Sequence, residues 1–260
     1  NEFGRFLDDN GLWDDALGGA MPFSELQQRF LQGKLRDELV HDLRAYLQTV
    51  CEPLAVRSSS ILEDSLHLPL AGLYSTYMLP NNDPSVEERL ASLLAAVKLV
   101  WASTYGEDAR AYFRQTSYRL EDERMAVVIQ TLGGGRRGDH FYPSFSGVAQ
   151  SYNFYPVSYM KPEDGVAQIA VGLGKTVVEG GPIVRFCPRY PQLLPQFANM
   201  RDWLYFTQKD FYGLDMAPIQ GPRDPATMDR LKLLPLSEAE DRRVLQPLAS
   251  VYQPESGLLV

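Results

Sequence analysis

The stretch VRSSSILEDS at residues 56–65 holds the densest group of side chains that could do chemistry. We expect Arg57 to end a short apolar strand that runs into a polar turn. A guanidinium held in a defined position at the end of a strand suits phosphate binding, because its planar fork can donate two parallel hydrogen bonds. The serines at 58–60 would add hydroxyl and backbone N–H groups, which can form an anion nest. The alternative, an ordinary serine turn with Arg57 paired to Glu63 or Asp64, is the commoner arrangement.

Two other segments offer groups that could meet a ligand. Gln130 ends the apolar run MAVVIQTL, and a buried strand that leaves into a loop there would expose backbone groups able to read an adenine edge. A polar residue that merely caps a strand explains Gln130 equally well. Gly147, in FSGVAQS, would let another backbone or a ligand approach closely, and a strand glycine beside a bulge is the alternative.

Two glycine-containing stretches resemble phosphate loops only superficially. The run GLGKT at residues 172–176 lacks the glycine that a P-loop needs five positions before Gly174, where Ile169 stands. It also continues as an apolar run with β-branched residues, so we expect no helix to open there. GGGRRGDH at 133–140 predicts a flexible hairpin connection, a lid over a nucleotide at most, with exposed arginines and no partner that orients His140.

Composition excludes several classes of function. The chain has 260 residues, 45% of them hydrophobic, and a formal net charge of −8, which argues against nucleic-acid binding. No run approaches the ~20 apolar residues of a membrane span, and no signal sequence opens the chain. Two distant cysteines and three scattered histidines make a structural zinc site improbable and fit a reducing, cytoplasmic setting. The chain opens without methionine and stops within a strand-like tail, and we interpret it as a piece of a longer protein.

The pattern of apolar residues predicts an α+β fold. Helices are expected over 22–50, with a break near Gly33, over 85–105, and over 106–117. Strands are expected at EPLAVRSSS, AGLYSTYMLP, RMAVVIQTL, FSGVAQSYNF and GVAQIAVGLG, and the last three of these should be buried. The proline-rich tail from 187 onward shows short helical patches such as MRDWLYFTQKDFY. The aromatic residues Tyr142, Phe145, Tyr152, Phe154, Tyr155 and Tyr159 should pack in the core and loops.

Taken together, six segments resemble the nucleotide-binding domain of the phosphoenolpyruvate synthase and pyruvate phosphate dikinase family. They are LAVRSSSILEDS, LAGLYSTYML, LLAAVKLVWASTYGEDARAYFR, MAVVIQTL, FSGVAQS and AVGLGKTVVEGG, and they occur in the family's order between about Pro53 and Gly181. The resemblance implies an incomplete ATP-grasp-like domain. It suggests a helical segment over 1–52, a core over 53–186 and a C-terminal extension over 187–260. It also identifies GLGKTVVEGG with the family's GLGE-x-VV-x-G strand and turn.

The resemblance implies roles for individual residues. Arg57, with the adjoining Ser58, matches the V-R-S-S motif that contacts the nucleotide phosphates, and Arg57 would stabilise the transferring phosphoryl group. The family's phosphate-closing loop corresponds to Gly72 and Thr76. Gln130, with backbone neighbours Ile129, Thr131 and Leu132, matches the hinge that meets adenine, and the S-G-V strand beside the nucleotide corresponds to Ser146, Gly147 and Val148.

The sequence also departs from the family pattern. Lys175 replaces the usual glutamate of GLGE, and residues 1–50 contain no match to the family's lysine before V-R-S-S. The late D-I-E and I-x-Q patterns that hold magnesium have no match either, so ligands for Mg²⁺ are expected outside this chain. The role of the arginine-containing run RFCPRYPQLLP does not follow from the resemblance.

These observations predict the ATP-binding part of a phosphoenolpyruvate-synthase-like phosphotransferase. The partners implied are ATP and separate phosphohistidine and pyruvate-binding domains of the parent protein, with neither nucleic acid nor membrane. The isolated chain should be a poor catalyst, since it lacks metal ligands and acceptor. The alternatives are a non-catalytic nucleotide-sensing or assembly module of the same fold, which Lys175 favours, and a dikinase acting on another acceptor.

Overall fold

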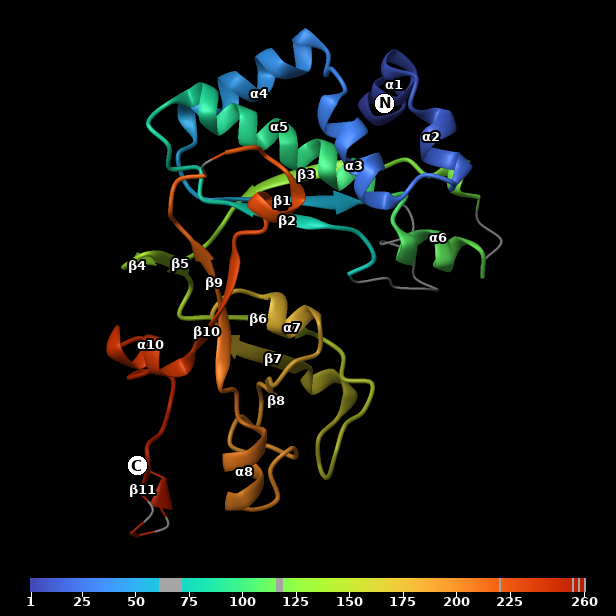
Figure 1. The fold of residues 1–260 in the computed structure, drawn as a ribbon. Coiled ribbons are helices and arrows are strands. Elements are labelled where there is room, and N and C mark those ends of the chain that lie inside the picture. The colour runs from blue at the N-terminus through green and yellow to red at the C-terminus, as the bar shows by residue number, and fades with distance from the viewer. Residues whose placement is uncertain (61–71, 116–118, 220, 254, 257, 260) are drawn as a thin grey trace. The chain divides into compact units, whose positions relative to one another are not determined.

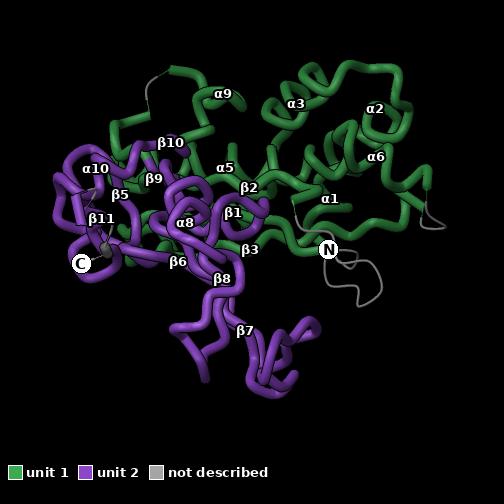
Figure 2. The backbone as a smooth tube through the Cα atoms, turned by 90° about the horizontal axis from the view of Figure 1, so that it is seen from below, with its two compact units in different colours: residues 1–132, 215–230 green, residues 133–214, 231–260 purple. Residues whose placement is uncertain are grey.

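A computed structural model describes residues 1–60, 72–115, 119–219, 221–253, 255–256 and 258–259 (Figure 1). Contacts divide the chain into two compact units, drawn in green and purple in Figure 2. Unit 1 comprises Asn1–Leu132 and Asp215–Arg230, and unit 2 comprises Gly133–Leu214 and Leu231–Val260. The first boundary falls at Leu132, within the stretch 53–186 that the sequence suggests as one core.

Unit 1 places helices against a small antiparallel sheet. Its helices are α1 (Glu2–Asn10), α2 (Trp13–Gly18), α3 (Phe23–Gln32), α4 (Asp37–Thr49), α5 (Val86–Ser103), α6 (Glu107–Phe113) and α9 (Pro225–Met228), with a 3₁₀ turn η1 at Leu120–Asp122. Its strands are β1 (Leu54–Ser59), β2 (Thr76–Leu79) and β3 (Ala126–Thr131), in the order β2-β1-β3. The long helix α5 packs against these strands and also against α3 and α4.

The expected break in the first long helical stretch is confirmed. Helix α3 ends at Gln32, α4 begins at Asp37, and Gly33 follows α3. A Cβ atom on Gly33 would lie 2.7 Å from Cζ of Phe6, so a larger residue would collide with the aromatic core. The rings of Phe6 and Trp101 lie 5.2 Å apart there, which joins the N-terminal helix α1 to the buried face of α5.

Unit 2 is richer in strands. Its strands are β4 (Gly135–Arg137), β5 (His140–Tyr142), β6 (Phe145–Gln150), β7 (Val166–Val171), β8 (Val184–Phe186), β9 (Asp210–Asp215), β10 (Leu231–Pro235), β11 (Tyr252–Gln253) and β12 (Leu258–Leu259). Its helices are α7 (Lys175–Val178), α8 (Met200–Phe206) and α10 (Leu236–Asp241), with a 3₁₀ turn η2 at Pro162–Asp164. The strands form sheets in the orders β10-β9-β5-β4 and β6-β7-β8, and β11 pairs with β12.

Two glutamine side chains complete strand pairing in unit 2. The Gln208 amide accepts from the Val171 backbone N–H at 2.8 Å and donates to the Val171 carbonyl at 3.0 Å. Gln196 bonds in the same way beside β8, accepting from the N–H of Arg185 at 2.8 Å and donating to the carbonyl of Ile183 at 3.1 Å. Each amide therefore satisfies backbone groups as a neighbouring strand would.

The α+β class is confirmed, and several details of the expected elements need correction. Strand β3 is half-buried to exposed and β6 is largely exposed, whereas both were expected to be buried. Each of these strands lies at the edge of its sheet in the described part of the chain, so it has a neighbouring strand on one side only and is less covered by other residues. The run after Gly174 was expected not to open a helix, yet it forms the single turn α7. None of the described helices is long and apolar enough to cross a membrane.

Candidate functional site

The two faces of the β2-β1-β3 sheet differ in character. Because side chains alternate along a strand, Leu54, Val56 and Ser58 share one face of β1, while Arg57 lies on the other. The first face is covered: Leu54 and Val56 belong to the core beneath α5, as do Tyr77 and Leu79 of β2. Burial raises the pKa of the Tyr77 hydroxyl above its usual range, which is consistent with a dry environment on this side.

The opposite face, which we call the open face, brings together three residues that the sequence predicts for nucleotide binding. Arg57 is the direct Cα partner of Thr76 in the β1–β2 pair. On the other side, Arg57 pairs with Val128, so Gln130 of β3 is its diagonal neighbour. Diagonal neighbours lie about 7–8 Å apart, within reach of long side chains. Arg57, Thr76 and Gln130 are all exposed. One ligand lying across the open face could contact all three.

The open face also carries residues that the site prediction missed. Met78 lies two residues from Thr76 in β2, and Val128 lies two residues from Gln130 in β3. The period of two along these strands is the signal that could have found them. Both side chains are half-buried, so they supply an apolar floor between the polar groups.

The serine turn expected after Arg57 is wrong for its first two residues. Strand β1 does not end at Arg57 but continues through Ser58 and Ser59, which pair with Val127 and Ala126 of β3. Ser58 is buried on the covered face and therefore points away from Arg57. The proposed alternative partners of Arg57, Glu63 and Asp64, lie outside the described residues.

The hinge and loop residues of the prediction lie at the ends of the same strands. Ile129 and Thr131 point to the face opposite Gln130, so only their backbone groups can serve a ligand beside Gln130. Leu132 follows the strand and donates its backbone N–H to the Pro53 carbonyl at 2.7 Å. Gly72 lies before β2 with φ of +86°, a conformation that suits glycine, and is exposed.

The remaining predicted residues, Ser146, Gly147 and Val148, lie in β6 of unit 2. The hydroxyl of Ser146 donates to the Gly172 carbonyl at 2.8 Å, which ties β6 to the turn that precedes α7. A Cβ atom on Gly147 would lie 2.4 Å from the carbonyl oxygen of Gln168 in β7. The close approach expected at Gly147 is thus made by a neighbouring backbone. Pairing with β7 is continuous from Phe145 to Gln150, which rules out a bulge at this glycine.

Lys175, which departs from the family pattern, is the first residue of α7. Its ammonium nitrogen lies 5.0 Å from the centre of the Tyr212 ring and 3.6 Å from a carboxylate oxygen of Glu179. The side chain is about a third exposed. A cation–π contact and a loose ion pair therefore hold Lys175 within unit 2.

The hairpin expected at 133–140 is confirmed, and two of its details are corrected. Strands β4 and β5 form the hairpin, with Gly138 in the turn at φ of +65°. His140 has an orienting partner, because its Nδ1 lies 3.2 Å from a carboxylate oxygen of Glu238. Arg137 is half-buried instead of exposed, and its guanidinium lies 5.6 Å from the centre of the Tyr142 ring.

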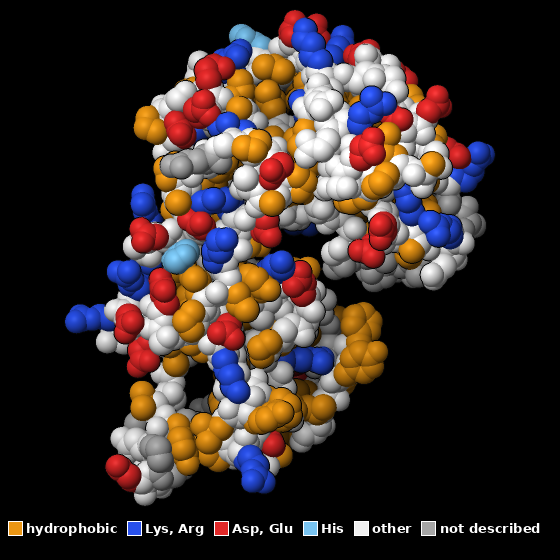
Figure 3. Space-filling model, viewed as in Figure 1, with side chains coloured by type: hydrophobic (Ala, Val, Ile, Leu, Met, Phe, Trp, Pro, Cys, Tyr) orange, Lys and Arg blue, Asp and Glu red, His pale blue; other side chains and the backbone are white. Residues whose placement is uncertain are grey.

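The six aromatic residues were expected to pack in the core and in loops, and four of them make ring contacts: Tyr142 in the core, and Tyr152, Phe154 and Tyr159 in the connection after β6. Tyr142 is fully buried and its ring lies 4.7 Å from that of Phe211. The other five are exposed: Phe145, Tyr152, Phe154, Tyr155 and Tyr159. Phe145 lies on the edge strand β6, and the other four lie on the connection from β6 to η2. Exposed hydrophobic side chains of this kind are visible in the space-filling view (Figure 3).

The described residues do not form a ready metal site. No group of three or more His, Cys, Asp or Glu side chains among them could hold a metal ion. Magnesium prefers carboxylate oxygens together with the phosphates of a bound nucleotide. The described side chains therefore do not fit a resident Mg²⁺, and we derive no step through it.

Comparison with known proteins connects this geometry to a family. The family described as “Pyruvate phosphate dikinase, AMP/ATP-binding domain” matches residues 13–188, which include the predicted nucleotide-binding residues of both units. A protein of Bacillus subtilis (strain 168), “Uncharacterized phosphotransferase YvkC”, is 29% identical over 183 residues, which are 69% of this chain and 19% of the relative. A “Probable phosphoenolpyruvate synthase” of Archaeoglobus fulgidus is 29% identical over 127 residues, or 49% of this chain and 14% of the relative. The chain thus spans about a fifth or less of these relatives' lengths.

Proposed function

The chain belongs to the pyruvate phosphate dikinase AMP/ATP-binding domain family, and we propose that the open face of its β2-β1-β3 sheet binds ATP. The observation that carries this proposal is the juxtaposition of Arg57, Thr76 and Gln130 on that face, all exposed. Arg57 supplies charge, Thr76 a hydroxyl beside it, and Gln130 an amide on the next strand. Three groups of this kind suit a ligand with an anionic end and a heterocyclic end.

Arg57 is the residue that we assign to the phosphates. Its planar guanidinium can donate up to five hydrogen bonds, in a fork that matches the oxygens of a phosphate group. In phosphoryl transfer the protein mainly positions the reactants and stabilises the charge that develops on the transferring group. Thr76, its direct neighbour across β1–β2, would fix the position of the same phosphates through its hydroxyl.

We assign adenine to the outer edge of β3. This strand lies at the edge of its sheet among the described residues, so alternate backbone N–H and C=O groups of Ile129–Thr131 face away from β1. Such groups present the donor and acceptor pattern that an adenine edge requires. The Gln130 side chain would add a further hydrogen bond from the open face.

For the whole protein, we propose phosphate transfer from ATP to a histidine on a separate domain, towards phosphoenolpyruvate made from pyruvate. The printed names of the two relatives, a phosphotransferase and a probable phosphoenolpyruvate synthase, support a reaction of this class. This chain would then be the phosphate donor site, and by itself a poor catalyst. If the purified chain hydrolysed ATP and Arg57→Ala abolished that activity, the expectation of a poor catalyst would be contradicted.

Calorimetric titration of Mg-ATP into the purified chain tests the site. Arg57→Ala should weaken binding about 10- to 150-fold, the equivalent of about 1.5–3 kcal/mol for a hydrogen bond to a charged group. The matched control is Arg5→Ala, since Arg5 is an exposed arginine in α1 whose ion pair with Glu2 lies on the surface. Equal affinities for Arg57→Ala, Arg5→Ala and the unaltered chain would overturn the assignment.

A further inference from the structure

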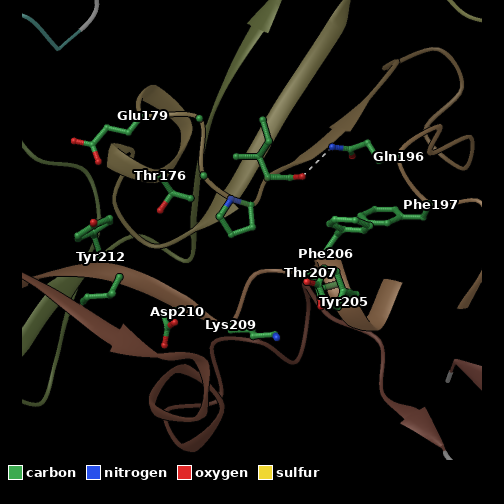
Figure 4. Close-up of a pocket in the computed structure, with 15 residues that line it drawn as sticks. Thr176, Glu179, Gln196, Phe197, Tyr205, Phe206, Thr207, Lys209, Asp210 and Tyr212 are labelled. Atoms are coloured by element: carbon green, nitrogen blue, oxygen red, sulfur yellow. Dashed lines mark hydrogen bonds between the residues drawn. The ribbon is translucent and has the colours of Figure 1, made fainter. Parts of the chain in front are cut away.

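Unit 2 contains a hollow of about 970 Å³ that the proposed ATP site does not use. Its walls come from the segment that includes α7 and the following turn, from Gln196 and Phe197, from the end of α8, and from β9 and β10 (Figure 4). A volume of this size lies at the upper end of the range for small-molecule sites, which is about 300–1,000 Å³. Neither Arg57, Thr76 nor Gln130 lines it.

The walls are held in place by bonds that do not depend on a ligand. Gln196 is fixed by its two hydrogen bonds beside β8. On the opposite side of the hollow, the Gly181 N–H donates to the Thr176 carbonyl at 2.9 Å and closes the turn after α7. The Leu173 N–H donates to the Tyr212 carbonyl at 2.9 Å, which ties the turn before α7 to β9. The hollow is therefore formed in advance, and filling it needs little reorganisation.

Aromatic rings supply much of the lining. Phe197 and Phe206 lie on one side of the hollow in Figure 4, facing Thr176 and Glu179 across it. One face of Phe197 is stacked on Trp203, with ring centres 4.4 Å apart, so the ring is fixed. Phe206 is 56% exposed although it is aromatic, which leaves apolar surface available to a ligand.

The rings around this hollow already attract ammonium groups of the protein. Lys175 lies over Tyr212, and Lys209 lies 5.9 Å from the centre of the Tyr205 ring. The negative face of an aromatic ring attracts a cation in this way. Phe197 and Phe206 have no such cation among the described contacts, so the face of Phe197 that is not stacked on Trp203 and the ring of Phe206 remain for a ligand.

The charges of the lining favour a cation as well. Lys175 offsets the charge of the lining residue Glu179, and Lys209 lies over the Tyr205 ring, so Asp210 is the lining carboxylate that remains to face a cation. Glu179 is near Lys175 and points away from the phenylalanine rings in Figure 4. Asp210 is exposed, and none of the ion pairs among the described residues involves it. We propose that this hollow binds a small organic cation with a flat apolar body, whose rings lie against Phe197 and Phe206 and whose charge faces Asp210.

Two planar dyes of opposite charge test the proposal with the whole chain. Thioflavin T carries a permanent positive charge, and 8-anilinonaphthalene-1-sulfonate carries a negative one. We expect thioflavin T to bind at one site, about tenfold more tightly than the anionic dye. Asp210→Asn should weaken thioflavin T binding about fivefold, and Phe206→Ala about tenfold, as measured by dye fluorescence and calorimetry.

Matched controls distinguish binding in this hollow from nonspecific binding of the dye elsewhere on the surface. Asp241→Asn makes the same charge change in α10, and Phe154→Ala removes a 72%-exposed ring of unit 2, and neither residue lines the hollow. Both controls should bind thioflavin T like the unaltered chain. Circular dichroism should show that all four variants fold, since the altered side chains are exposed. Equal dye affinity in Asp210→Asn, Phe206→Ala and their controls, or tighter binding of the anionic dye, would overturn the proposal.

Discussion

Arg57 of β1 and Thr76 of β2 are direct partners across an antiparallel strand pair, and both side chains are exposed on the same face of the sheet. Direct partners have Cβ atoms about 4.5–5.5 Å apart. A guanidinium and a hydroxyl at this spacing can bind oxygens of one phosphate group. Their separation along the sequence alone would not show that they lie this close. The pair is therefore a sharper basis for the ATP site than either residue alone.

The pairing predicts that the effects of Arg57→Ala and Thr76→Ala on Mg-ATP affinity are not additive. Groups that share one ligand group are expected to show a coupling of about 0.5–3 kcal/mol. Titration calorimetry of the two single variants and the double variant measures this energy. As a control pair we suggest Arg57→Ala with Thr49→Ala, because Thr49 ends α4 and lies outside the sheet. Additive losses for Arg57 and Thr76 would show that the two residues do not act on the same phosphate.

The strands that carry the proposed site could be predicted from the sequence, because local patterns specify them. Apolar runs and one alternating segment predict β1, β2 and β3, and the resemblance of the motifs to the family then points to Arg57, Thr76 and Gln130. The helical period of α5 likewise predicts the buried Leu93, Val97 and Val100. In each case the decisive information lies within one segment.

The rest could not be predicted because it depends on which segments meet. The burial of Ser58 follows from the extension of β1 to Ser59, which pairing with β3 stabilises. The His140–Glu238 contact joins residues 98 positions apart, and the pairing of Gln208 with Val171 joins residues 37 positions apart. No local pattern predicts these contacts. The hollow beside Phe197 and Phe206 is likewise assembled from several separate segments.

Gly147→Ala should destabilise unit 2. The added methyl group would lie 2.4 Å from the Gln168 carbonyl oxygen, which belongs to the paired strand β7 and cannot move without disturbing the ladder. Overpacking of this kind costs about 1–3 kcal/mol of unfolding free energy. Urea denaturation measures the loss. Gly133→Ala is the control, because nothing lies within 4 Å of its added Cβ. A Gly147→Ala chain as stable as this control would show that β6 and β7 are farther apart than described.

Gln208→Ala should also lower the free energy of unfolding, here by about 1–3 kcal/mol. The truncation removes both hydrogen bonds to the Val171 backbone and a third, at 2.9 Å, to the Asp210 carbonyl. Val171 is half-buried, so water replaces these bonds only in part. The same substitution at Gln28, on the exposed side of α3, should change stability by less than about 0.5 kcal/mol. If the two glutamine variants unfold at the same urea concentration, the amide of Gln208 does not complete the strand.

Tyr105→Phe should make unit 1 less sensitive to alkaline pH. Burial raises the pKa of the Tyr105 hydroxyl above its usual range, and the nearby Arg110 and Arg124 offset the rise only in part. A raised folded-state pKa contributes stability that is fully present below the unfolded-state pKa of about 10 and is lost as the pH rises further. The unfolding free energy of the unaltered chain should therefore fall as the pH rises above about 10. The unfolding free energy of Tyr105→Phe should fall less steeply with pH, because the substitution removes one of the buried tyrosine hydroxyls that cause the fall.

Urea denaturation at several pH values, together with the ultraviolet absorbance of tyrosinate, measures this effect. The control is Tyr155→Phe, since Tyr155 is 78% exposed and the substitution removes the same hydroxyl from the surface instead of from the core. Burial also raises the pKa values of Tyr77 and Tyr142, so a reduced slope, and not its disappearance, is expected in Tyr105→Phe. Identical slopes in Tyr105→Phe and Tyr155→Phe would mean that Tyr105 ionises as readily in the folded chain as in the unfolded one, and that its packing against Phe3 and Phe30 does not keep water out.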